Sequence, residues 1–125
     1  MGDYLELKDL NAYKYARQYS RLAWGTYQEL DWKQKKIIGD QMIRSVDSVG
    51  ANIAEGYGRF HYLDKNKFYY NARGSLLETQ HWFGLMRERE IINQSQFKKF
   101  EVLSENIGKC LNGLISKQYN LNQKS

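Results

Sequence analysis

Residues 38–56 read IGDQMIRSVDSVGANIAEG, and this stretch decides the fold. Its apolar residues follow one another at steps of four, four, three and four. They are Ile38, Met42, Val46, Val49 and Ile53. Residues at these steps lie on one face of an α-helix, because a helix has about 3.6 residues per turn. The stretch predicts an amphipathic helix that ends at Gly56, since glycine is common just after the last helical residue.

Three further stretches have the same period. The first contains Ala12, Ala16, Tyr19, Ala23 and Tyr27. The next contains Phe68, Ala72, Leu76, Thr79, Phe83 and Met86. The last contains Phe100, Leu103, Ile107, Cys110 and Leu114, in strict heptad spacing. We expect these three helices to have as N-caps Asp9, Asp64 and Ser95. We expect the buried core to include Val46, Val49, Ile53, Leu76, Phe83, Leu103, Ile107 and Leu114.

The connections between these four helices are short, and proline is absent from the chain. Short connections make helices that follow one another in sequence pack as antiparallel neighbours. The sequence therefore predicts an all-α protein, an antiparallel up-down-up-down four-helix bundle. We expect a single four-helix-bundle domain over residues 1–125, with residues 119–125 as a frayed tail.

The N-terminal segment predicts a cytoplasmic protein. Residues 1–6 read MGDYLE and carry acids where a signal peptide needs basic residues. No apolar run approaches the ~18 residues of a membrane span, so we expect no membrane partner. Cys110 is the one cysteine, which excludes a disulfide within the chain.

Two helices carry small polar residues beside their apolar faces. One set is Ser45, Ser48 and Asn52, and the other is Ala72, Ser75 and Thr79. Small side chains at helical spacing let two helix backbones approach closely. Their polar atoms then need partners across the seam or on backbone carbonyls. We interpret this pattern as helix packing, with a ligand site as the alternative.

Signatures of catalysis and metal binding are missing. His61 and His81 are the histidines of the chain, and neither has a partner at metal-ligand spacing. Glu78 and His81 are three residues apart, but a di-iron bundle needs two such motifs and two further glutamates. Cys110 falls on an apolar helix face, which favours packing over reactivity. We therefore expect no catalytic residues, no metal, no cofactor and no enzymatic activity.

The basic residues favour an anionic partner. The net charge is +5 and the pI about 9.3. No acid lies between Asp9 and Glu29, and the basic stripe in this segment consists of Lys14, Arg17 and Arg21. The next helix opens with Lys33, Lys35 and Lys36. Tyr13 and Tyr15 flank the stripe and could stack on bases. We interpret these residues as nucleic-acid-binding, and the alternative is a solvated helix face.

Two segments resemble the signature of the "four helix bundle protein" family. They are RSVDSVGANIAEG at residues 44–56 and ARGSLLET at residues 72–79. The residues on which the resemblance rests are Arg44, Ser45, Ser48, Asn52, Glu55, Gly56, Arg73, Gly74, Ser75 and Glu78. Members often carry a Phe-Pro turn between the first two helices, where this chain has Leu30-Asp31-Trp32. The family includes the 23S rRNA intervening-sequence proteins and the accessory variability determinants of diversity-generating retroelements.

The resemblance implies a bacterial protein that assembles as a homopentamer. The retroelement members resemble basic pentamers that bind nucleic acid and a reverse transcriptase, and no member is known as an enzyme. Ten tyrosines and three tryptophans also favour an interface, because both residues are enriched where proteins meet. We expect the interface to include some of Trp24, Trp32, Tyr62 and Trp82.

Glu55 needs a cation nearby. It falls in the last turn of its helix, where the helix dipole disfavours an acid. We expect it to be neutralised by one of Arg44, Arg59 and Arg73.

Two functions remain open. The first is a non-enzymatic oligomer that binds RNA or DNA, as an accessory subunit to a reverse transcriptase or an rRNA-associated factor. The second is a structural or protein-interaction scaffold whose charge only keeps it in solution.

Overall fold

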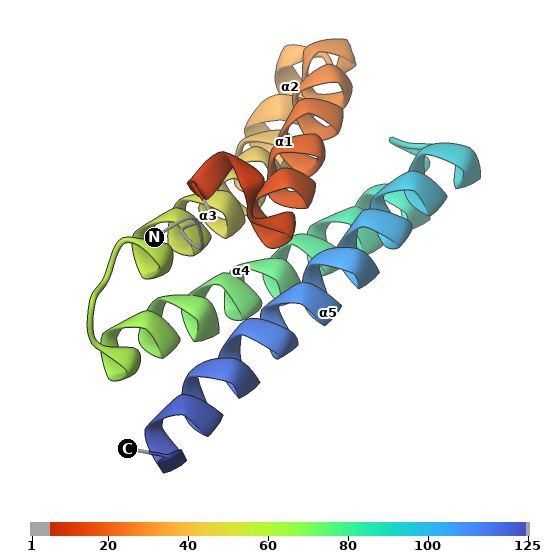
Figure 1. The fold of residues 1–125 in the computed structure, drawn as a ribbon. Helices are drawn as coiled ribbons and strands as arrows, with labels where there is room; N and C mark the ends of the chain where they lie inside the picture. The colour runs from red at the N-terminus through yellow and green to blue at the C-terminus, as the bar shows by residue number, and fades with distance from the viewer. Residues whose placement is uncertain (1–5, 125) are drawn as a thin grey trace.

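The segments predicted to be helical are helical in the computed structural model, which describes residues 6–124. The elements are the 3-10 helix η1 (Leu7–Asp9), α1 (Asn11–Glu29), α2 (Trp32–Gln34), the π-helical turn η2 (Lys35–Gly39), α3 (Asp40–Tyr57), α4 (Tyr62–Glu88) and α5 (Gln94–Lys124). Because α2, η2 and α3 follow one another without a break, the described residues form four long rods and no strand (Figure 1). Residues 1–5, which carry the sequence case against a signal peptide, lie outside the described part of the chain, as does residue 125.

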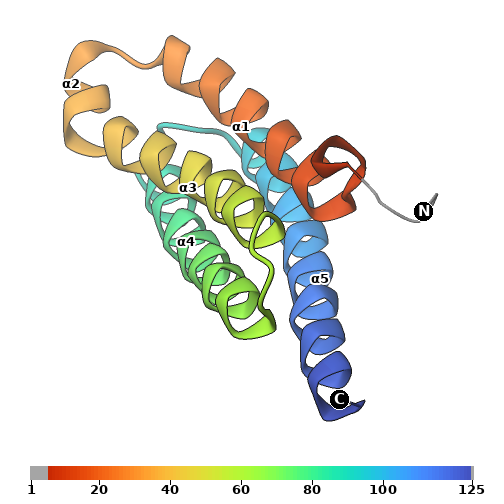
Figure 2. The same cartoon turned by 60° about the vertical axis from the view of Figure 1, so that its left-hand side comes forward.

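The four rods form a ring in which each packs on two neighbours. α1 packs on α3 and α5, and α4 packs on the same two helices from the opposite side (Figures 1 and 2). Neighbouring rods run antiparallel, so the predicted up-down-up-down bundle is confirmed. Among the described helices, none is both long and apolar enough to cross a membrane.

Three aromatic rings from three helices occupy the centre of the core. Phe83 of α4 and Phe100 of α5 are stacked with centroids 3.7 Å apart, and Tyr19 of α1 meets both rings edge-on. The Tyr19 hydroxyl is 2.6 Å from the Ser104 hydroxyl, and burial raises the pKa of Tyr19. The predicted core residues found buried are Val46, Val49, Ile53, Leu76, Phe83 and Ile107.

The buried face of α5 differs from the predicted heptad. The buried residues are Phe100, Ser104, Ile107, Leu111 and Ile115. The predicted positions that are only half-buried are Leu103, Cys110 and Leu114. A straight α-helix drifts ~20° per heptad away from a strict seven-residue repeat, and the buried Tyr19 hydroxyl needs Ser104 as its partner. α5 also continues to Lys124 through most of the tail expected to fray, since no glycine or proline follows Gly113.

The predicted N-caps were wrong at three helix starts. Those predictions were Asp9, Asp64 and Ser95. α1 begins after Leu10, which makes no side-chain cap, because η1 occupies residues 7–9. α4 begins after His61, whose Nδ1 accepts the Leu63 N–H at 3.4 Å. At the start of α5, Asn93 and Gln96 each accept the other's backbone N–H at 2.8 Å, which is a capping box.

The prediction that the helix ends at Gly56 was wrong. Gly56 lies inside α3, where it allows a close contact with α4. α3 continues to Tyr57, and no described glycine has a positive φ. A Cβ at Gly56 would lie 2.8 Å from Cε1 of Tyr69 and 3.1 Å from the Lys65 carbonyl oxygen. The end of α3 is capped by a cation instead, because Lys65 Nζ donates to the Tyr57 carbonyl at 2.9 Å.

Hydroxyl groups bridge α3 and α4, as the small polar residues predict. The Ser48 and Ser75 hydroxyls are 2.9 Å apart, and so are the hydroxyls of Ser45 and Thr79. Asn52 donates to the Ser48 carbonyl oxygen at 2.9 Å. These short side chains satisfy one another while the two backbones stay close.

Enlarging Ser48 should destabilise the bundle more than truncating it. We expect Ser48→Ala to cost about 1 kcal/mol for the lost hydroxyl contacts. Ser48→Leu should cost roughly 1–3 kcal/mol beyond that, because overpacking forces α3 and α4 apart. Denaturant melts of both variants measure the difference. Equal stability would show that α3 and α4 need no close approach at this position.

The fold should lose stability at alkaline pH. Burial raises the pKa of Tyr69 from 10.0 to about 12, so the folded chain holds this proton more tightly than the unfolded chain. Stability is therefore intact below pH 10 and falls as the pH rises from 10 toward 12. Tyr69→Phe should make this fall shallower. Urea melts across this pH range test it, and an unchanged slope in the variant would contradict it.

Candidate nucleic-acid interface

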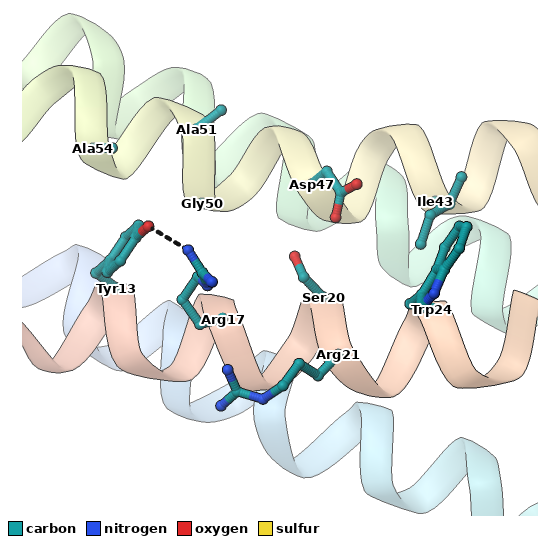
Figure 3. A pocket seen from close by; sticks show the side chains of 10 residues that line it. All are labelled: Tyr13, Arg17, Ser20, Arg21, Trp24, Ile43, Asp47, Gly50, Ala51 and Ala54. Atoms are coloured by element: carbon teal, nitrogen blue, oxygen red, sulfur yellow. Dashed lines mark hydrogen bonds between the residues drawn. The ribbon is translucent and has the colours of Figure 1, made fainter. Parts of the chain in front are cut away.

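A groove runs along the seam between α1 and α3. The two helices approach closely where Gly50 of α3 faces Ala16 of α1, with only 3.5 Å between a Cβ at Gly50 and the Ala16 methyl. The groove is about 440 Å³ in volume, and small α3 residues leave it open. Its lining residues are Tyr13, Arg17, Ser20, Arg21, Trp24, Ile43, Asp47, Gly50, Ala51 and Ala54 (Figure 3).

Arg17 is held at the edge of this groove by its neighbour one turn earlier. Its guanidinium donates to the Tyr13 hydroxyl at 3.0 Å and lies 5.8 Å from the centroid of that ring. Figure 3 shows both side chains rising from α1 toward α3, while Arg21 extends along α1 away from α3. The two arginines therefore present charge on both sides of the outer ridge of α1.

The three residues of the predicted stripe meet at a second hollow. This hollow of about 660 Å³ lies between η1 and α1, and Lys14, Arg17 and Arg21 all line it. All three side chains are exposed. In residues 6–124, none of them has a carboxylate within ion-pair distance. Their charge is therefore available to an external anion.

The second predicted cluster sits on the turn that joins α1 to α3. Lys35 Nζ lies 5.0 Å from the ring centroid of Tyr27, and Lys36 Nζ lies 5.7 Å from that of Trp32. Lys33 is exposed beside them. None of the three lysines forms an ion pair within the described residues.

A pair of stacked rings, not predicted from the sequence, joins the two basic clusters. Trp24 and Tyr27 stack with centroids 5.4 Å apart and planes 15° from parallel. Trp24 lines the same groove as Arg17, and Tyr27 lies under Lys35. The signal was present as two aromatic residues three apart on a helix that also carries the basic stripe. We call the surface formed by Lys14, Arg17, Arg21, Trp24, Tyr27, Trp32, Lys33, Lys35 and Lys36 the basic face.

Two acids lie along the same seam. Tyr27 donates its hydroxyl proton to Asp40 Oδ1 at 2.6 Å, and this bond is the main reason that the pKa of Tyr27 is raised. Asp47 lines the groove and is exposed. Asp40 keeps its negative charge but does not line the groove, so Asp47 is the acid in the lining that would repel an anion there.

Several signature residues hold the bundle together rather than line the groove. Those at the α3–α4 seam are Ser45, Ser48, Asn52, Gly56 and Ser75. Glu55 forms an ion pair with Arg59 across 3.0 Å, so Arg59 is the cation that neutralises it. Arg44 is exposed on α3.

The other α4 signature residues lie toward α5 and the surface. Arg73 donates to Asn112 of α5 at 2.9 Å, and Glu78 accepts from Trp82 Nε1 at 3.0 Å. Gly74 is exposed, and a Cβ there would meet nothing within 4 Å.

The described residues contain no group of three or more His, Cys, Asp or Glu side chains that could hold a metal ion. His61 caps α4, and His81 packs against Trp82 with ring centroids 4.9 Å apart. Cys110 is a free, half-buried thiol whose pKa is raised by burial, which keeps it protonated at neutral pH.

Comparison with known proteins finds matches to a family model and to solved structures. The model of the family described as 23S rRNA-intervening sequence protein matches residues 8–113. Among solved structures, the chain is similar to a protein of unknown function from the S23 ribosomal protein family of Bacteroides thetaiotaomicron. The TM-score is 0.78 at 25% identity, covering 84% of this chain and 95% of that one. No curated protein matches the chain.

Proposed function

The chain belongs to the 23S rRNA-intervening sequence protein family, and from that premise we propose that it is a non-enzymatic protein that binds nucleic acid through its basic face. One observation carries the proposal. Six basic side chains without ion-pair partners among the described residues flank the Trp24–Tyr27 stack on one side of the bundle. They are Lys14, Arg17, Arg21, Lys33, Lys35 and Lys36.

The chemistry of this face fits a phosphate backbone. Lysine and arginine contacts to phosphate position a strand without reading its sequence. Each neutralised phosphate releases counterions, so affinity should fall steeply as salt rises. Either RNA or DNA satisfies these contacts. A solvated helix face, the alternative, would show neither binding nor salt dependence.

The biological setting follows from the family resemblance. It favours a cytoplasmic accessory subunit of a reverse transcriptase or an rRNA-associated factor. The basic face would hold the nucleic acid, which leaves the α4–α5 side of the ring free for protein contacts.

A second face, on α4, could bind further copies of the chain. The expected assembly is the homopentamer that the family resemblance implies. Leu63, Tyr70 and Leu77 follow one another at steps of seven along α4, and all three are exposed. Gly74 lies among them, although no neighbour inside the chain needs a glycine there. A mid-helix glycine costs roughly 0.5–1 kcal/mol relative to alanine. Close approach of a second copy would account for both features. The same face would serve the scaffold function if the protein bound no nucleic acid.

Reversing the charge of two arginines should remove nucleic-acid binding. Arg17→Glu with Arg21→Glu exchanges two attractive charges for two repulsive ones beside phosphate. The matched control is Lys98→Glu with Lys109→Glu, which makes the same change in net charge on exposed positions of α5. We expect the first pair to lose at least about tenfold in RNA and DNA affinity at low salt and the control to lose little.

Fluorescence anisotropy at low and physiological salt provides the measurement. Equal losses for the two variants would mean that net charge, not the basic face, determines binding. If the parent protein bound neither RNA nor DNA at low salt, the structural or protein-interaction scaffold would be the function that remains.

Placing a charge on α4 should break the assembly. Leu77→Glu puts a carboxylate in the apolar row, and a buried unpaired charge is costly at an interface. Val102→Glu on α5 is the matched control, since Val102 is also exposed and apolar. Sedimentation velocity should show a smaller species for Leu77→Glu alone. A monomeric parent at micromolar concentration would contradict the proposal.

A further inference from the structure

We propose that the basic face selects single-stranded over double-stranded nucleic acid and stacks unpaired bases on Trp32 and Trp24. This inference rests on the proposed function, since it specifies which form of nucleic acid the same face binds. It follows from the position of the aromatic rings among the cations.

Trp32 is the most accessible ring on this face. It is 73% exposed, and Lys36 Nζ lies 5.7 Å from its ring centroid. It stands at the first position of α2, where the capping box of Asp31 and Gln34 fixes the turn. Its exposure leaves a large indole surface in water, which a base could cover.

Trp24 is the second ring, and its orientation is fixed. Stacking on Tyr27 holds it, and Tyr27 is in turn held by its 2.6 Å bond to Asp40. Even so, Trp24 is 52% exposed and lines the groove that contains Arg17. A ring already held in place loses little conformational entropy when a base stacks on it.

Cations accompany the rings along the seam. The ring–cation pairs are Tyr13 with Arg17, Tyr27 with Lys35, and Trp32 with Lys36. Tyr13 and Trp24 are eleven residues apart on α1, which is about 16 Å at 1.5 Å per residue. Along this seam, aromatic rings alternate with basic side chains. A single strand lying there could stack its bases on the rings and place its phosphates beside the cations. Sequence-tolerant single-strand binders use this arrangement.

A duplex cannot use the rings in this way. Its bases are stacked on one another and present only their edges in the grooves. Only the lysines and arginines would contact a duplex, and they also contact the phosphates of a single strand. The tryptophans therefore add affinity for the single strand alone.

The experiment compares single strands with duplexes on matched variants. Labelled oligouridylate and oligothymidylate of about 12 nucleotides serve as single strands, and RNA and DNA duplexes of the same length are the comparison. Trp32→Ala and Trp24→Ala should each weaken single-strand binding by roughly 5- to 150-fold, the range for loss of one base stack. Duplex binding should change little. Trp32→Phe should restore most of the affinity, because a ring of any kind can stack.

Tyr119→Ala is the control, since Tyr119 on α5 is 59% exposed and lies off the basic face. Duplex binding as tight as single-strand binding, or single-strand affinity unchanged in both tryptophan variants, would overturn the inference. The proposed function would survive that result if Arg17→Glu with Arg21→Glu still weakened binding at least about tenfold and the lysine control did not. A parent that bound neither form at low salt would overturn both. Unequal affinity for oligouridylate and oligothymidylate would show which of the two polymers the face prefers, since they differ in the sugar and in the thymine methyl group.

Discussion

The hydroxyl contacts between α3 and α4 set the distance between these two helices, and the rest of the bundle adapts to it. Ser48 and Ser75 occupy little space, so bulk must be supplied elsewhere in the core. The stacked rings of Phe83 and Phe100, with Tyr19 against their edges, supply it near α1 and α5. The family signature falls mainly on this seam and the neighbouring surface of α4. The residues that define the family are therefore largely different from those of the basic face.

The fold could be predicted where the residues that follow the apolar helical period are also the buried ones, as they are from Ile38 to Ile53. The prediction failed where a partner from another helix decides the outcome. A strict heptad favours Leu103 on the buried face of α5, but Ser104 is buried there because the Tyr19 hydroxyl needs it. The predicted end of the helix at Gly56 was wrong for a similar reason, since this glycine makes room for Tyr69 of α4 rather than forming a turn.

Only part of the candidate site could be predicted from the sequence. The charge of the stripe around Arg17 could be read directly, because helical spacing and the absence of intervening acids need no tertiary information. The link between Trp24, Tyr27 and Lys35 could not, since it depends on how the chain reverses between α1 and α3. Asp31 caps that reversal and makes it compatible with a helix that starts at once.

The π-helical turn η2 has a consequence for how this protein can change over evolutionary time. A π turn contains one residue more than a regular helix would place there, so it is equivalent to an insertion absorbed without breaking the rod. Losing that residue would restore a regular α-helix with the residues on either side still facing the same way, because the wider π turn spreads about the same rotation over one residue more. Trp32 and Lys33 before the turn and the core from Met42 onward would keep their sides of the molecule. One residue can thus be gained or lost at this turn without redirecting the binding surface or altering the scaffold.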